Sequence, residues 1–189
     1  ECMTSALLSP FPSSDTAPAA AWAHTKQLVE NLQVITHLGP ELTKEALVQF
    51  EAIALPSVLQ CIAHPHNAVR TMAAACCVKM AAAHEQTIMT TILATVRPLI
   101  SDTTNHCKRC GAAAIMGLMV RDMAPDVLIP YAVLLLVPLM GSMSDPLHCI
   151  RHLAASSFAS LVPLLPLVSS STPPPEMDDE MLAMSHKDS

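Results

Sequence analysis

Residues 126–167 decide the fold, with the sequence DVLIPYAVLLLVPLMGSMSDPLHCIRHLAASSFASLVPLLPL. The first half is almost entirely apolar up to Gly141, and the second half carries apolar residues at steps of three or four. This spacing places side chains on one face of a helix, so the stretch predicts two packed antiparallel helices. We expect the second helix to start at Ser144, Asp145 and Pro146. Ser or Asp can accept a hydrogen bond from a free N–H of the first turn, and proline suits the first helical position.

Two upstream segments repeat the start of this second helix. The three copies are NAVRTMAA at 67–74, HCKRCGAA at 106–113 and HCIRHLAA at 148–155. Each copy has an arginine followed by an alanine three residues later, and these pairs are Arg70 with Ala73, Arg109 with Ala112, and Arg151 with Ala154. Successive arginines are separated by 39 residues (70 to 109) and 42 residues (109 to 151).

An acidic residue precedes two of these arginines. Asp102 lies seven residues before Arg109, and Asp145 lies six residues before Arg151. We expect each carboxylate either to cap the start of its own helix or to pair with the arginine of an adjacent unit. A period of about 40 residues with two helices per unit is typical of HEAT and armadillo repeats.

The predicted fold is therefore all-α, a HEAT- or armadillo-type solenoid of antiparallel helical hairpins over residues 19–168. We expect a disordered leader over residues 1–18 and an acidic, Ser- and Pro-rich tail over residues 169–189. Upstream of the three copies, residues 19–38 predict a helix that Gly39-Pro40 ends, and Pro56 interrupts a second helical pattern over residues 41–63.

The middle copy departs most from the pattern. Lys108 stands where the other copies have Val69 and Ile150. Gly111 and Gly117 are each expected to cost about 1 kcal/mol relative to alanine in a helix interior.

Composition excludes several classes of protein. Apolar residues make up 51% of the chain and aromatic residues only 3%, which is unsuited to a β-sandwich. The net charge of −6 and the scattered basic residues do not favour a general nucleic-acid binder. The seven cysteines are an odd number, and we expect reduced thiols rather than a disulfide framework.

A membrane-spanning helix is an alternative for the apolar run. The strongly apolar part, residues 127–140, is shorter than the roughly 20 residues that a bilayer requires, and it contains Pro130 and Pro138. We therefore favour a helix buried within the array.

A metal or redox site is a second alternative. Cys107 and Cys110 form a CxxC pair, and His106, His148, Cys149 and His152 add further candidate ligands. Structural zinc requires four converging nitrogen or sulfur ligands, and no second CxxC has matching spacing. The nine histidines suggest solvated or capping residues near helix ends, and no catalytic, phosphate-binding or cofactor-binding motif is present. We expect no cofactor and no enzymatic activity in this chain.

The run IPYAVLLLVPLMGSMSD at 129–145, followed by IRHLAASSFASLVPLLPL at 150–167, resembles one protein family. It is similar to the HEAT region of the TATA-binding-protein-associated Swi/Snf-type ATPases, and LQCIAHPHNAVRTMAAACCVKMA at 59–81 resembles an earlier repeat of that region. The resemblance implies a HEAT array that precedes a helicase-like ATPase domain in a regulator that removes TATA-binding protein from DNA.

By the same resemblance, the implied partners are TATA-binding protein and the family's own ATPase module, with DNA contacted only indirectly and no membrane. The implied location is the nucleus. The alternative is a generic HEAT adaptor, such as a transport or phosphatase scaffold, unrelated to TATA-binding protein.

Overall fold

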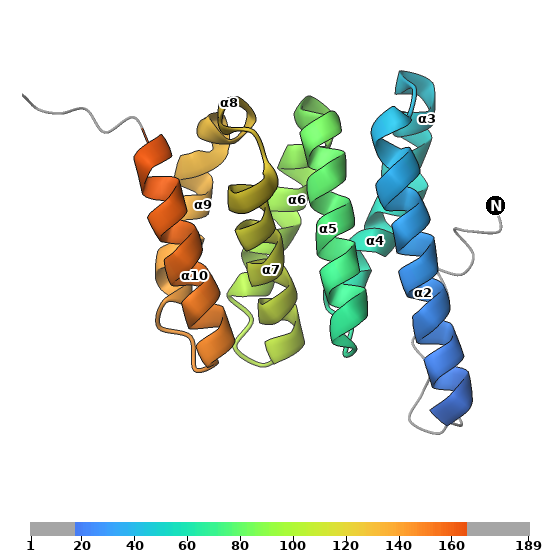
Figure 1. The fold of residues 1–189 in the computed structure, drawn as a ribbon, viewed down its shortest axis with the longest axis horizontal. Helices are drawn as coiled ribbons and strands as arrows, with labels where there is room; N and C mark the ends of the chain where they lie inside the picture. Colours follow the sequence, from blue (N-terminus) through green and yellow to red (C-terminus); the bar gives the residue numbers. More distant parts are fainter. Residues whose placement is uncertain (1–17, 166–189) are drawn as a thin grey trace, which may run out of the picture.

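We describe the protein from a computed structural model that covers the backbone of residues 18–165 (Figure 1). The leader expected at residues 1–18 and the tail expected at residues 169–189 lie outside the described residues, except for Pro18, which begins the first helix. Every regular element within residues 18–165 is helical, so the prediction of an all-α solenoid is confirmed.

Three helical hairpins follow an initial long helix, α2 (Pro18–Leu38). The first hairpin pairs a broken first helix with α5 (Asn67–Ala83). The second pairs α6 (Glu85–Ile100) with α7 (His106–Asp122). The third pairs α9 (Ala132–Ser142) with α10 (His148–Leu161). Short elements complete the chain: η1 (Gly39–Glu41), α8 (Pro125–Leu128), η3 (Ile129–Tyr131) and η4 (Val162–Leu164).

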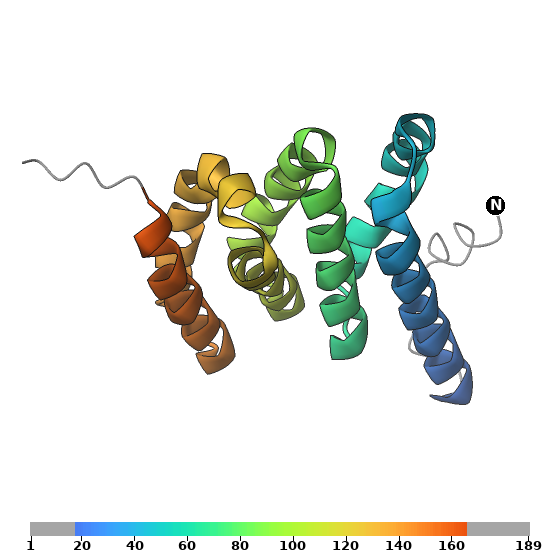
Figure 2. The same cartoon turned by 45° about the horizontal axis from the view of Figure 1, so that its top comes forward.

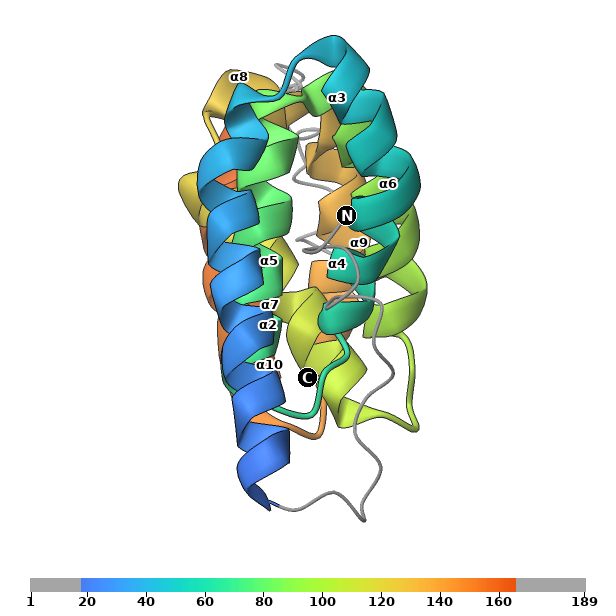
Figure 3. The same ribbon diagram turned by 90° about the vertical axis from the view of Figure 1, so that its right-hand side faces the viewer.

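The hairpins stack side by side in two layers. The view along the stack separates a layer of α2, α5, α7 and α10 from a layer containing α4, α6 and α9, with α4 spanning Leu55–Cys61 (Figure 3). The view across the stack shows the order α2, α5, α7, α10 (Figures 1 and 2). We call these the inner layer (α2, α5, α7, α10) and the outer layer (α4, α6, α9). Successive inner-layer helices pack closely against one another, whereas α6 and α9 share few close contacts.

Proline shapes the outer-layer helices. The first hairpin begins with α3 (Lys44–Gln49), whose N-terminus is capped by the hydroxyl of Thr43. A π-helical turn, η2 (Phe50–Ala54), then leads into α4, which has Pro56 in its first turn. The interruption predicted at Pro56 is therefore confirmed. Its physical reason is that proline lacks an N–H and clashes with the preceding turn.

The last helix starts later than the sequence suggested. We expected α10 to begin at residues 144–146, but it begins at His148, with Leu147 as the residue before its first turn. Asp145 instead accepts a hydrogen bond from the N–H of Leu147 at 2.8 Å. This local bond holds the backbone in a turn, so Pro146 lies between the two helices and not inside the second.

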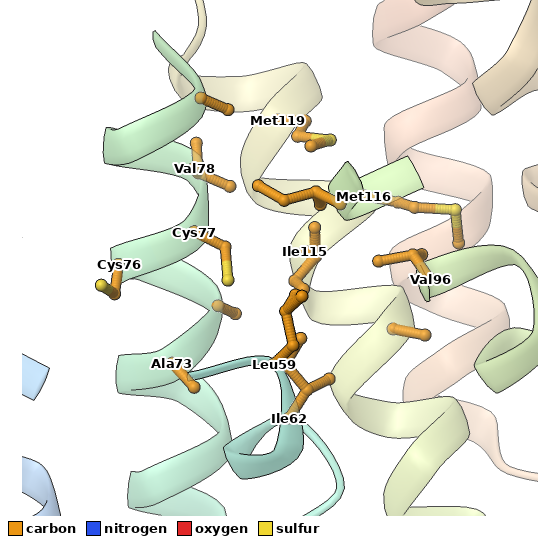
Figure 4. Close-up of a cluster of buried hydrophobic side chains, with 14 of the residues drawn as sticks. Leu59, Ile62, Ala73, Cys76, Cys77, Val78, Val96, Ile115, Met116 and Met119 are labelled. Atoms are coloured by element: carbon orange, nitrogen blue, oxygen red, sulfur yellow. The ribbon is translucent and has the colours of Figure 1, made fainter. Parts of the chain in front are cut away.

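The core is a continuous seam between the layers. Every hairpin contributes aliphatic side chains, the first two hairpins add buried methionines, and the first adds buried cysteines. In Figure 4, Cys77 of α5 points toward Ile115 of α7, whereas Cys76 points to the opposite side of α5. Both thiols are fully buried, and burial raises the pKa of Cys76 to about 12. The reduced thiols expected from the sequence fit these apolar surroundings, in which a buried cysteine is unreactive.

Glycine in the middle repeat has a packing role that its helix propensity conceals. A Cβ atom at Gly111 would overlap the carbonyl oxygen of Ile62, directly after α4 in the first hairpin. A Cβ atom at Gly117 would lie 2.7 Å from the side chain of Leu153 on α10. The propensity cost predicted for Gly111 and Gly117 is therefore accompanied by close approach of α7 to both neighbouring hairpins.

We predict that Gly111→Ala lowers the free energy of unfolding by about 2 kcal/mol, because the new methyl group meets backbone that cannot rotate away. Gly141→Ala is the matched control, since nothing lies within 4 Å of the position that a Cβ atom would take at this residue of α9. The control should be neutral or stabilising by up to about 1 kcal/mol. Urea unfolding followed by circular dichroism measures both, and equal effects would contradict the packing role of Gly111.

Candidate functional site

Each hairpin has one turn between its two helices, and the three turns have the same hydrogen-bond pattern. In each, one side chain accepts a hydrogen bond from the backbone N–H two residues later. Asp102 accepts from Thr104 at 2.9 Å, and Asp145 accepts from Leu147 at 2.8 Å. In the first hairpin, Nδ1 of His64 accepts from the N–H of His66 at 2.9 Å.

His64 is thus the counterpart of the two aspartates, and sequence reasoning missed it. The signal was its position, six residues before Arg70, as Asp145 lies six residues before Arg151. Unlike the solvated histidines expected at helix ends, His64 is buried, with 4% of its surface exposed. Burial lowers the pKa of His64 below its usual value of 6.5. A backbone hydrogen bond with His66 opposes this shift, whereas the charges of His66, His24 and Arg70 add to it.

Each repeat arginine folds back onto the turn before its own helix. Arg70 donates to the carbonyls of His64 and Pro65 at 2.8 and 2.7 Å. Arg151 donates to the carbonyls of Asp145 and Pro146 at 2.7 and 2.8 Å. Arg109 donates to the carbonyl of Asp102 at 2.9 Å. These bonds satisfy carbonyl groups that have no partner in a helix.

Arg109 also links two hairpins. Its Nε donates to Oδ2 of Asp145 at 2.7 Å, and the two side chains are only 11% and 7% exposed. Asp145 therefore both caps its own turn and pairs with the neighbouring unit. Asp102 bonds instead within its own unit, to Lys108 at 2.7 Å.

The repeat alanines lie in the core of the inner layer. Ala73, Ala112 and Ala154 are each at most 1% exposed, on α5, α7 and α10. Small side chains at these positions allow neighbouring helices to approach closely. All the residues of the predicted repeat signature therefore have packing or turn-forming contacts in the structure.

The candidate metal and redox residues form no common site. Cys107 and Cys110 are partly exposed, Cys149 is exposed, and Sγ of Cys107 lies 3.4 Å from Nε2 of His106. The rings of His148 and His152 stack with centroids 6.2 Å apart. Within residues 18–165, no three His, Cys, Asp or Glu side chains are placed to hold one metal ion.

The feature that the sequence analysis did not anticipate is a groove between α6 and α9. It has a volume of about 970 Å³ and is lined by apolar side chains of both helices. Leu93 and Ala94 lie on the α6 side, and Leu134 and Pro138 lie on the α9 side. The buried pair of Arg109 and Asp145 also lines it. We call this the α6–α9 groove.

The outer side of α9 continues this apolar surface. Val133, Leu134, Val137 and Met140 are between 53% and 70% exposed, whereas Leu135 on the opposite side is 1% exposed. The expectation of a buried helix is therefore wrong for the outer side of α9. Residues Pro125–Ser142 are long and apolar enough to cross a membrane by length and composition, but they form three short helical elements, and one such stretch is weak support for a span.

Exposed apolar patches of this kind mark contact surfaces for other protein segments. Sequence periodicity could not reveal which side of α9 is exposed, because α9 is apolar on all sides and has no contrast between faces.

The buried ion pair gives a stability prediction. Asp145→Asn keeps an oxygen acceptor for the N–H of Leu147 but leaves the Arg109 charge buried without its partner, so unfolding should cost about 3 kcal/mol less. Asp122→Asn is the control, because the pair of Arg121 and Asp122 is 71% and 41% exposed and should change stability by less than about 1 kcal/mol. Similar losses in urea unfolding of both variants would count against a role for burial.

His64 gives a pH prediction. Because its folded pKa lies below that of the unfolded chain, the unfolded state binds the extra proton first. The contribution of neutral His64 to the free energy of unfolding is fully present above pH 6.5, and it falls as the pH drops from there toward the folded pKa. His64→Asn keeps an acceptor but cannot titrate, so its unfolding midpoint should fall less than that of the wild type between about pH 7.5 and about pH 5. Parallel curves for the two proteins would refute this role.

The chain is similar to known proteins in its repeat and over most of its length. Residues 54–84, which cover α4 and α5, match the HEAT repeat family model. The chain is 33% identical over 177 residues to "TATA-binding protein-associated factor BTAF1" of Arabidopsis thaliana, which covers 92% of this chain and 9% of that protein. It is 32% identical over 166 residues to "TATA-binding protein-associated factor 172" of Homo sapiens, covering 86% of this chain and 9% of the relative.

A more distant relative, "TATA-binding protein-associated factor MOT1" of Saccharomyces cerevisiae, is 26% identical over 158 residues, covering 84% of this chain and 8% of the relative. The chain thus spans less than a tenth of the length of these relatives. The family resemblance predicted from the sequence is confirmed: the chain is a HEAT-repeat solenoid similar to one segment of the TATA-binding protein-associated factors.

Proposed function

We propose that this chain is a protein-interaction scaffold that works as part of a TATA-binding protein-associated ATPase in the nucleus. In this role it serves the removal of TATA-binding protein from DNA and so regulates transcription. The observation that carries the proposal is the similarity over 92% of the chain to a factor of that name. The stacked hairpins support it, because HEAT arrays present extended surfaces to protein partners.

The mechanism is positioning by a stiff body. Each hairpin contacts its neighbours through close inner-layer packing, and the pair of Arg109 and Asp145 fixes the second hairpin to the third. Such an array can hold two bound proteins at a constant separation, so that movement of one is transmitted to the other. The chain itself then performs no chemistry, and the hydrolysis of ATP belongs to the motor domain of the whole protein.

The partners that we propose are TATA-binding protein and the ATPase module, with DNA contacted only through them. The surface best suited to a protein partner in residues 18–165 is the exposed side of α9 together with the α6–α9 groove. Leu134 and Val137 are 62% and 70% exposed there, and burying them against a partner would stabilise a complex by about 1.5–3 kcal/mol each.

Co-purification tests the proposal. The chain is mixed separately with purified TATA-binding protein and with the ATPase module of a related factor, and retention is measured. We expect at least one to bind, and we expect Leu134→Glu with Val137→Glu to weaken that binding by at least about tenfold. Val48→Glu, at an equally exposed position on α3, is the control and should bind normally.

Binding to neither protein would contradict the assigned role and leave a HEAT adaptor for other partners. Binding that survives the double substitution would place the contact on another surface of the array.

A further inference from the structure

The α6–α9 groove is partly open to solvent. Its α9 wall presents Leu134 and Val137, and within residues 18–165 no other element covers them. Exposed apolar surface is unfavourable in water, so binding of a segment that covers this surface would be favourable.

Two segments of the chain, residues 1–17 and 166–189, lie outside the described residues. Their sequences differ in whether they contain an apolar face at helical spacing. In the second, Met177, Met181 and Met184 follow one another at steps of four and three, the spacing of one helix face. Residues 178–180 between them are Asp-Asp-Glu. Residues 1–17 contain two prolines close together in PFP and only isolated acids, so they offer no such face.

The place where the described chain ends also favours residues 166–189. The described chain ends at Leu165, directly after α10 and η4, and α10 packs against α9. Met177 is twelve positions after Leu165, which allows a span of up to about 40 Å, whereas a helix is only about 10 Å across. The start of α2 lies at the opposite end of the stack (Figure 1).

Charge and side-chain type agree with this choice. Arg97 is an exposed cation on the α6 side of the groove, and it takes part in no ion pair within residues 18–165. The acidic residues at 178–180 can pair with it. Methionine side chains are flexible and fit irregular apolar grooves, as they do at other peptide-binding surfaces.

We infer that residues 176–184 bind in the α6–α9 groove of the same chain, with the three methionines against α9 and the acidic residues near Arg97. A tethered segment has an effective concentration in the millimolar range, so contacts with a dissociation constant below that range keep the groove mostly filled. The segment then competes with any protein that uses the groove. The inference requires only the groove and stands whether or not TATA-binding protein is a partner.

Site-specific photocrosslinking in the full chain tests this. Leu134 is replaced by p-benzoylphenylalanine, the protein is irradiated, and crosslinked peptides are identified by mass spectrometry. We expect crosslinks to the peptide that contains residues 176–184. The same photoreactive residue at Val48 on α3, which is 66% exposed, is the control and should give none to that peptide.

Two sets of variants sharpen the result. Replacing Met177, Met181 and Met184 by Asp should lower the crosslink yield at least about tenfold, because three apolar contacts are lost together. Arg97→Glu should lower it by about twofold, as expected for an exposed ion pair. The methionine variant should still unfold in one cooperative transition, with a free energy of unfolding lower by no more than about 1–2 kcal/mol, the contribution of the docked segment, which separates loss of docking from loss of fold.

A mixture with ¹⁵N-labelled chains that lack the photoreactive residue identifies the source of the segment. Crosslinks only between unlabelled peptides support binding within one chain. Crosslinks to labelled peptides would overturn it in favour of a second copy. Crosslinks to residues 1–17, or no crosslink at Leu134, would overturn it as well.

Discussion

The close approach of the inner-layer helices is the constraint on which the structure depends. A helical hairpin cannot bury its apolar face alone, so it must pack against the next hairpin. Alanines are buried on α5, α7 and α10, and Gly117 of α7 leaves room for the side chain of Leu153 on α10. The outer layer is not held in this way, so α6 and α9 stand apart and leave the groove between them.

The polar groups of the turns are arranged around that packing. Each repeat arginine satisfies carbonyls of its own turn, and each turn has one side-chain acceptor for the N–H two residues on. Where the turn of the third hairpin meets the second, Asp145 adds a buried ion pair with Arg109. A buried charge is costly without its partner, so this pair fixes how the second and third hairpins are placed relative to each other.

These features support the proposed scaffold role. Fixed hairpins hold surfaces at constant separation, and the exposed side of α9 offers an apolar surface beside a groove of about 970 Å³. The chain is similar to TATA-binding protein-associated factors, and under the proposed function this surface would contact a protein partner. The proposed docking of residues 176–184 would fill the groove when no partner is bound.

The sequence by itself determined the helical hairpins, their period of about 40 residues and the places of Arg70, Arg109 and Arg151, because helix periodicity and turn chemistry are local properties of the chain. It also determined the family resemblance. It did not show that Asp145 rather than Asp102 would pair between units, that His64 would replace an aspartate, or that α9 would expose one side. These depend on which groups from distant residues come together, and only the stacking of the hairpins decides which charges are buried and which apolar faces remain open to water.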